Sequence, residues 1–225
     1  MALDIGVSVG PSLGNFYPGH NAAALAHLEL WMAGSTRSPV PTYVWGDHGS
    51  GKTHLLTAVA DHIEGQGGQV GWLDKTTLHP AEFNPAWEVL LLDDVQHFSA
   101  VLQHMAFNWF VNAATPGAAR QPWVLAAGSL PPQDLPLRED LRTRLGWGHV
   151  FHLQLLDDDQ RREVLLKHAQ ALGMHLGPEL LDYLLSRFSR DLGHLMDLLQ
   201  QLDNYALQTQ RPLTIPLLRA MLDET

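Results

Sequence analysis

The 225-residue chain contains no cysteine and carries little positive charge. The absence of cysteine excludes disulfides, thiolate zinc sites, iron–sulfur clusters and cysteine nucleophiles. Lys and Arg number 14 against 24 Asp and Glu, so the formal net charge is -10 when histidine is neutral. This balance argues against an extended grip on a nucleic-acid backbone. Protonating all 13 histidines would bring the charge to +3 (-10 + 13), so the argument holds near neutral pH.

Long apolar runs are missing as well. No apolar stretch reaches the roughly 18 residues that a membrane-spanning helix needs. The N-terminus lacks the basic and apolar regions of a secretory signal. Hydrophobic residues nevertheless make up 45% of the chain, enough to build a full core. We therefore expect a globular cytoplasmic protein with no membrane partner.

Hydrophobic periodicity divides the chain into two parts. Short apolar runs predict strands, and amphipathic stretches between them predict helices, the first of which Asn21 is expected to cap. This alternation predicts an α/β domain with a parallel sheet over residues 21–155, preceded by a tail over 1–20. From residue 156 the spacing is helical, which predicts a small helical domain over 156–225. The expected strands are 41–46, 69–73, 88–93, 123–127 and 149–153, and the expected helices of the first part are 21–32, 52–63 and 101–113.

The loop after the first predicted strand fits the phosphate-binding pattern G-x-x-x-x-G-K-[ST] and leads directly into a helix. Its glycines would let backbone N–H groups converge on phosphates at the positive end of that helix. Lys52 is expected to reach the β- and γ-phosphates, and Thr53 to bind Mg²⁺ through its hydroxyl. A purely structural glycine-rich turn is the alternative. The residues of the loop are Gly46, Asp47, His48, Gly49, Ser50, Gly51, Lys52 and Thr53.

The apolar strand at 88–93 ends in a pair of carboxylates, Asp93 and Asp94. Asp93 is expected to hold Mg²⁺ through water. Asp94 stands where many related ATPases place a glutamate that orients the attacking water, and its shorter side chain predicts slow ATP hydrolysis or none. The alternative is that the pair caps a helix. An extra strand between the two motifs is typical of AAA+ proteins, so we predict a P-loop NTPase fold of the AAA+ type that binds ADP or ATP.

Several segments resemble the Hda family, regulatory AAA+ relatives of the bacterial replication initiator DnaA. The resemblance implies an AAA+ domain followed by a lid domain. It also implies a function: acting with the DNA-loaded sliding clamp, the β subunit of DNA polymerase III, to stimulate ATP hydrolysis by DnaA and prevent re-initiation. Subunits of this family stack head to tail, which implies self-association. The segments are 15–21, 45–54, 92–96, 128–132, 137–145, 147–148 and 211–216.

The resemblance further assigns roles to single residues. Arg144 would be the arginine that enters the nucleotide site of a neighbouring subunit, where a planar guanidinium suits phosphoryl charge. Ser129 would sense the γ-phosphate, and Tyr17 and Asn21 would border the adenine. From the residues alone, Arg144 is equally consistent with a solvated or helix-capping arginine, and Tyr17 and Asn21 with a helix-entry turn.

Two positions depart from the family pattern. Relatives carry an arginine in the third lid helix where this chain has Gly193, and Arg190, one turn earlier, is the expected substitute. The family's clamp-binding peptide has a Gln-Leu-x-Leu core. Here the corresponding residues are Ala2-Leu3-Asp4-Ile5, so Leu3 and Ile5 are the expected clamp-binding residues and the glutamine is missing.

Most of the histidines and tryptophans are explained without a role in binding metal or another ligand. His48 and His54 flank the phosphate loop and are expected to add to anion binding. The other histidines are scattered and are expected to be isolated side chains rather than metal ligands. The tryptophans near the strands, Trp147 among them, are expected to belong to the core. Asp157 and the two acidic residues after it are expected to favour a helix N-terminus.

Three functions remain open from the sequence. The first is a regulator that donates Arg144 to an initiator and hydrolyses ATP weakly or not at all. The second is an autonomous ATPase or kinase, and the third is an ATPase that loads or remodels DNA without binding the clamp. The acidic balance disfavours the third, and the segment 97–117 contains no Lys or Arg. The chain ends after the helical part, whereas an initiator continues into a DNA-reading helix-turn-helix domain, so no sequence-specific DNA binding is expected.

Overall fold

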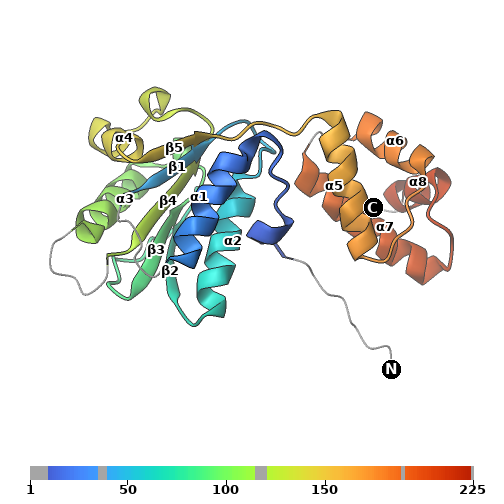
Figure 1. The fold of residues 1–225 in the computed structure, drawn as a ribbon, viewed down its shortest axis with the longest axis horizontal. Coiled ribbons are helices and arrows are strands. Elements are labelled where there is room, and N and C mark those ends of the chain that lie inside the picture. The colour runs from blue at the N-terminus through green and yellow to red at the C-terminus, as the bar shows by residue number, and fades with distance from the viewer. Residues whose placement is uncertain (1–9, 35–39, 115–120, 189–190, 224–225) are drawn as a thin grey trace. The chain divides into compact units, whose positions relative to one another are not determined.

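The computed structural model describes residues 10–34, 40–114, 121–188 and 191–223. They divide into two compact units, and the division falls between Leu155 and Leu156. The N-terminal unit is a sheet with helices on both faces, and the C-terminal unit is helical (Figure 1). Among the described residues, no helix combines the length and apolar character needed to cross a membrane.

The sheet of the N-terminal unit has five strands in the order β2-β3-β4-β1-β5, and every neighbouring pair is parallel. This order places β1 between β4 and β5, so the loop that follows β1 emerges between the ends of two other strands. Each strand agrees with its predicted range to within one or two residues. The strands are β1 Thr42–Trp45, β2 Gln69–Leu73, β3 Trp87–Leu92, β4 Trp123–Gly128 and β5 His149–His152.

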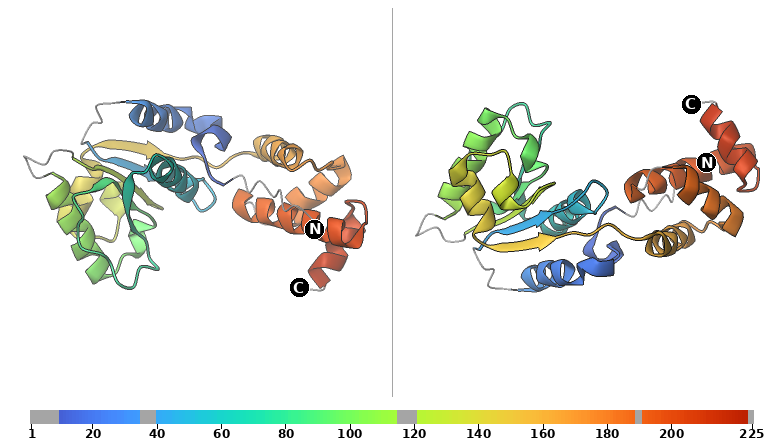
Figure 2. Two further views of the ribbon diagram at one scale, coloured as in Figure 1. Left: turned by 90° about the horizontal axis from the view of Figure 1, so that it is seen from below. Right: turned by 90° about the horizontal axis from the view of Figure 1, so that it is seen from above.

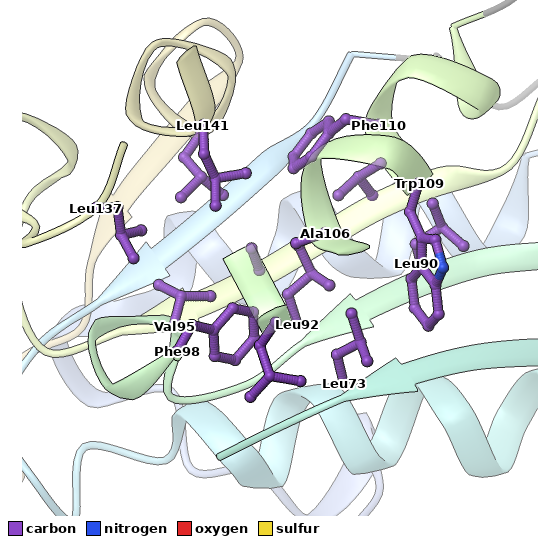
Figure 3. Close-up of a cluster of buried hydrophobic side chains, with 14 of the residues drawn as sticks. Leu73, Leu90, Leu92, Val95, Phe98, Ala106, Trp109, Phe110, Leu137 and Leu141 are labelled. Atoms are coloured by element: carbon purple, nitrogen blue, oxygen red, sulfur yellow. The ribbon is translucent and has the colours of Figure 1, made fainter. Parts of the chain in front are cut away.

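Helices cover both faces of this sheet (Figure 2). Helices α1 (Ala22–Ala33) and α2 (Lys52–Gly65) pack against one face, and α3 (Ala100–Ala113) and α4 (Glu139–Gly146) against the other. The last four residues of strand β3 are all apolar and buried because their side chains alternate between two cores. Val89 and Leu91 join the core under α1 and α2, whereas Leu90 and Leu92 join the core under α3 and α4. Figure 3 shows the core under α3 and α4.

Two local expectations for this unit are wrong. Asn21 precedes α1 but makes no side-chain capping hydrogen bond. Its side chain instead bridges to the chain after β5, because Nδ2 donates to the carbonyl oxygen of Gln154 at 2.9 Å and Oδ1 accepts from its backbone N–H at 2.8 Å. Trp147, expected in the core, follows the end of α4 and is 74% exposed.

The C-terminal unit has a core of its own, built from leucines at helical spacing on four helices. Asp157 caps the first of them in a capping box with Gln160, which confirms the acidic helix start expected from the sequence. Leu165, Leu184, Leu195 and Leu218 are fully buried in this core. The helices are α5 Asp158–Ala171, α6 Pro178–Arg187, α7 Leu192–Thr209 and α8 Ile215–Asp223.

Acidification is expected to destabilise the fold through histidines. Burial lowers the pKa of His27, His54 and His168. Unfolded histidine titrates near about pH 6.5, so below that pH the unfolded chain binds more protons than the folded chain. The contribution of these histidines to the free energy of unfolding should be fully present above about pH 6.5. It should fall as the pH drops toward the lowered pKa values.

The measurement is the urea midpoint of unfolding as a function of pH. We expect it to decline between about pH 7 and pH 5. His168→Gln should make the decline shallower, and the exposed His175→Gln serves as the control. Equal slopes for His168→Gln and the unaltered chain would contradict the assignment.

Candidate nucleotide-binding site

The phosphate-loop sequence lies between the end of β1 and the start of α2, as predicted. Two of its glycines are required by geometry. Gly51 has φ of 90°, a left-handed conformation that side chains rarely adopt, and a Cβ there would lie 2.7 Å from the ring of Phe16. A Cβ at Gly46 would lie 2.2 Å from the carbonyl oxygen of Leu153. The loop can therefore follow this path only with glycine at these two positions.

Lys52 begins α2 and turns its side chain back into the loop. Its ammonium donates to the carbonyl oxygens of Gly46 at 2.8 Å and Asp47 at 2.7 Å, and lies 3.4 Å from the Ser50 hydroxyl. The residue is only 8% exposed. Burial lowers the pKa of Lys52, and the nearby carboxylates of Asp94, Asp93 and Asp47 oppose that effect. A cation is thus held at the centre of the loop, where it can attract phosphate oxygens.

Thr53 and Asp93 come together directly beside this loop. The Thr53 hydroxyl donates to Oδ2 of Asp93 at 2.6 Å. Asp93 is 5% exposed, and its burial raises the pKa of the carboxyl group although the Thr53 hydrogen bond opposes the shift. A hydroxyl and a carboxylate side by side are hard oxygen donors of the type that Mg²⁺ prefers. These residues fit a magnesium ion held by Thr53 and, through water, by Asp93.

Asp94 is the second carboxylate of the pair, and its side chain is engaged on both oxygens. Lys75 Nζ lies 2.8 Å from Oδ2, and Gln96 Nε2 donates to Oδ1 at 3.1 Å. Burial raises the pKa of Asp94, but the Lys75 and Gln96 hydrogen bonds outweigh it and hold the pKa below its usual range. Asp94 has a left-handed backbone with φ of 53° and makes no side-chain helix cap, which rules out the capping alternative for this residue.

Gln96 connects this carboxylate to the end of β4. Its Oε1 accepts a hydrogen bond from the backbone N–H of Ser129 at 3.0 Å. The chain of contacts from Lys75 through Asp94 and Gln96 to Ser129 therefore joins the loop after β2, the turn after β3 and the loop after β4. Sequence reasoning gave no role to Lys75 or Gln96. One available signal was that Lys75 is one of only two lysines in residues 1–155.

The other expected nucleotide-binding residues surround the loop less directly. His48 is exposed, and Tyr17 is half-buried in the turn before α1. His54 lies against the N-terminal segment, where Nε2 donates to the Ser12 carbonyl oxygen at 3.0 Å and the ring contacts Phe16. Both polar groups of the Asn21 side chain are used by Gln154. The roles of these four residues stay predictions.

Arg144 lies on the last turn of α4, against α3. Its guanidinium carbon is 5.0 Å from the centre of the Phe107 ring. Arg190, Leu3 and Ile5 lie outside the described residues. Gly193 is in the first turn of α7, where its N–H donates to Asp191. Among the residues that the structure describes, no three His, Asp or Glu side chains gather as a possible metal site.

Comparisons with known proteins bear on both units. Residues 158–222 match the family described as "Hda, lid domain". Domain III of the replication initiation protein DnaA from Thermotoga maritima superposes with a TM-score of 0.73 at 21% identity, covering 95% of each chain. AMPPCP-bound DnaA from Aquifex aeolicus gives 0.64 at 22% identity, over 83% of this chain and 62% of that one. The Holliday junction branch migration motor RuvB from Thermotoga maritima gives 0.66 at 14% identity, over 95% and 71%.

The parallel sheet, the phosphate loop on β1 and the extra strand between the two motifs define a P-loop protein of the AAA+ class, as predicted. Within that class, residues 158–222 match the lid domain of the Hda family, and the fold of the chain is similar to that of DnaA domain III.

Proposed function

We propose that this chain is a nucleotide-binding regulator of replication initiation. With ADP or ATP and Mg²⁺ bound, it would act with the DNA-loaded sliding clamp to stimulate ATP hydrolysis by DnaA. The observation that carries this proposal is the combination of a DnaA-like AAA+ fold with a lid domain of the Hda family. The phosphate loop supports nucleotide binding, because Lys52 and the Thr53–Asp93 pair meet beside it.

The stimulation requires a residue that reaches another subunit, and Arg144 is our candidate. The magnesium ion would neutralise charge on the phosphates in the initiator's site. Arg144 would enter that site and donate N–H groups to the phosphate oxygens on which charge develops. Trp147 follows Arg144 by three residues and is 74% exposed. Exposed tryptophan and arginine are the residue types that most often dominate protein interfaces, which supports a contact surface at the end of α4.

The chain's own hydrolysis would be slow. A carboxylate that orients water must accept a hydrogen bond from it, and the oxygens of Asp94 already accept from Lys75 and Gln96, which compete with water for the remaining acceptor sites. The same head-to-tail contact that brings Arg144 to an initiator would permit self-association.

A second candidate function is that of an ATPase that remodels DNA, which the likeness in fold to the RuvB motor favours. The net charge of -10 counts against it.

Replacing Lys75 by alanine is expected to raise the intrinsic rate of ATP hydrolysis. The substitution removes the ammonium from Asp94 and frees that oxygen for water. An exposed ion pair is worth at most about 1 kcal/mol, so the rise should be about two- to fivefold. Lys167→Ala, which breaks an exposed ion pair with Glu163 on α5, is the control. A single-turnover assay that finds the same or a lower rate in Lys75→Ala would contradict this explanation.

Retention on the sliding clamp tests whether the clamp is a partner of this chain. The DNA-loaded clamp is immobilised, and the chain is passed over it with and without ADP. We expect the intact chain to be retained on the clamp. A chain that lacks residues 1–7 and the double variant Leu3→Ala, Ile5→Ala should both pass over the clamp without being retained. If the intact chain is not retained under either condition, clamp-dependent action is wrong and only a nucleotide-binding AAA+ protein remains.

A further inference from the structure

The ring of Phe107, on α3, lies beneath two arginines of the following segment. The guanidinium carbon of Arg144 is 5.0 Å from the ring centre, and that of Arg138 is 5.4 Å away. Both distances are within the range of about 6 Å over which a cation is attracted to an aromatic face. Phe107 is half-buried, so water screens these contacts less than it would on an open surface. One aromatic ring therefore restrains two cations.

Helix α3 also fixes the start of α4. The side chain of Gln103 accepts a hydrogen bond from the backbone N–H of Arg138 at 3.0 Å, and Arg138 precedes α4. Gln103 and Phe107 are four residues apart and so lie on one face of α3. This face therefore contacts both the residue that precedes α4 and the last turn of this short helix, which carries Arg144.

The two arginines differ in what else they contact. Arg138 pairs with Asp140 at 2.6 Å, so its guanidinium has a carboxylate partner. In the described part of the chain no carboxylate pairs with Arg144. An aromatic ring attracts a cation without supplying an oxygen acceptor, so the N–H donors of Arg144 remain available to oxygens from another molecule. Arg144 is thus restrained but not neutralised.

We propose that Phe107 is a positioning residue for Arg144. It limits the rotamers of the arginine so that less conformational entropy is lost when the guanidinium reaches the phosphates of a nucleotide bound to a partner subunit. The inference rests on the proposed role of Arg144 in that subunit's site. A role of Phe107 in packing alone is the competing explanation, and the two make different predictions for a leucine in its place.

Phe107→Leu and Phe107→Tyr separate these explanations. Leucine keeps apolar bulk between α3 and α4 but has no aromatic face, whereas tyrosine keeps the face. The readouts are the maximal rate of DnaA-bound ATP hydrolysis at saturating chain and clamp, and the melting temperature. We expect Phe107→Leu to lower the maximal rate about three- to fivefold, and Phe107→Tyr to restore it, with similar melting temperatures for both. Arg138→Ala, which removes the other cation from the ring, should retain the stimulation.

Arg144→Ala in the same assay identifies which claim fails. If Arg144→Ala abolishes stimulation while Phe107→Leu matches the unaltered chain, the positioning role is overturned and the proposed function survives. If Arg144→Ala stimulates fully, or the unaltered chain does not stimulate, the proposed function fails and this inference with it.

An independent readout is the NMR shift of the Arg144 side-chain protons. Ring currents should shift them upfield in the unaltered chain and in Phe107→Tyr but not in Phe107→Leu, and equal shifts in all three would overturn the contact.

Discussion

Arg144→Ala is expected to lower the clamp-dependent rate of ATP hydrolysis on DnaA by about a thousandfold or more while this chain still binds nucleotide normally. An arginine supplied from another subunit is worth roughly 10³ to 10⁵ in phosphoryl-transfer rate, because it stabilises charge that develops only in the transition state. Arg144 lies on α4 against Phe107, in contact with neither Lys52 nor the Thr53–Asp93 pair. The substitution should therefore leave the chain's own affinity for ADP unchanged.

Two matched variants make this experiment specific. Arg142→Ala removes the same kind of side chain two residues earlier, on a different side of the helix, and should stimulate as the unaltered chain does. Arg144→Lys keeps the charge but loses the planar array of N–H donors, so it should restore only part of the rate. Full stimulation by Arg144→Ala would exclude this residue as the one that enters the initiator's site.

Lys52→Ala should have the next largest effect, a loss of about 10- to 100-fold in affinity for ADP and ATP. Hydrogen bonds to charged groups contribute roughly 1.5 to 3 kcal/mol, and Lys52 is the cation held inside the phosphate loop. Affinity would be measured by calorimetric titration. Lys167→Ala on the lid is the control, and the melting temperature should be recorded because Lys52 is buried.

An unchanged affinity in Lys52→Ala would place nucleotide binding elsewhere. A drop in melting temperature together with loss of binding would be resolved by Thr53→Ala. The Thr53 hydroxyl is on an exposed residue, so this second variant should fold normally. It should weaken binding only when Mg²⁺ is present, because its expected role is to hold the metal.

The features that the sequence predicted correctly are those that depend on neighbouring residues. The phosphate loop needs glycine where the backbone is left-handed or crowded, as at Gly51 and Gly46, and this requirement is visible in the motif itself. Strand β3 is apolar on both faces, so its run of residues identified it and placed Asp93 at its end. The capping box at Asp157 is equally local.

The features that were missed depend on residues far apart in the chain. Asn21 bonds to Gln154, 133 residues away, and this contact replaces the helix cap expected from its position. Lys75 reaches Asp94 across 19 residues because β2 and β3 are neighbours in the sheet. Trp147 directly follows the end of α4 and is exposed, although its position next to β5 in the sequence suggested the core. No spacing rule gives such contacts, since they arise only when strands and helices are packed together.

The distribution of charge sharpens the contrast between regulator and DNA motor. Of the seven Lys and Arg residues in residues 1–155, three are Arg138, Arg142 and Arg144. Of the other cations that the structure describes in this unit, Lys52 lies in the phosphate loop and Lys75 pairs with Asp94, so neither is part of a basic surface that could follow a nucleic-acid backbone. A short helix with arginines and an exposed tryptophan suits contact with one site on another protein.

The rate of conversion of DnaA-bound ATP to ADP tests the central claim most directly. It should be measured with this chain alone, with the DNA-loaded clamp alone and with both together. We predict rapid conversion only when the chain and the clamp are both present. Conversion at the same rate with and without the chain would contradict a role in stimulating the initiator.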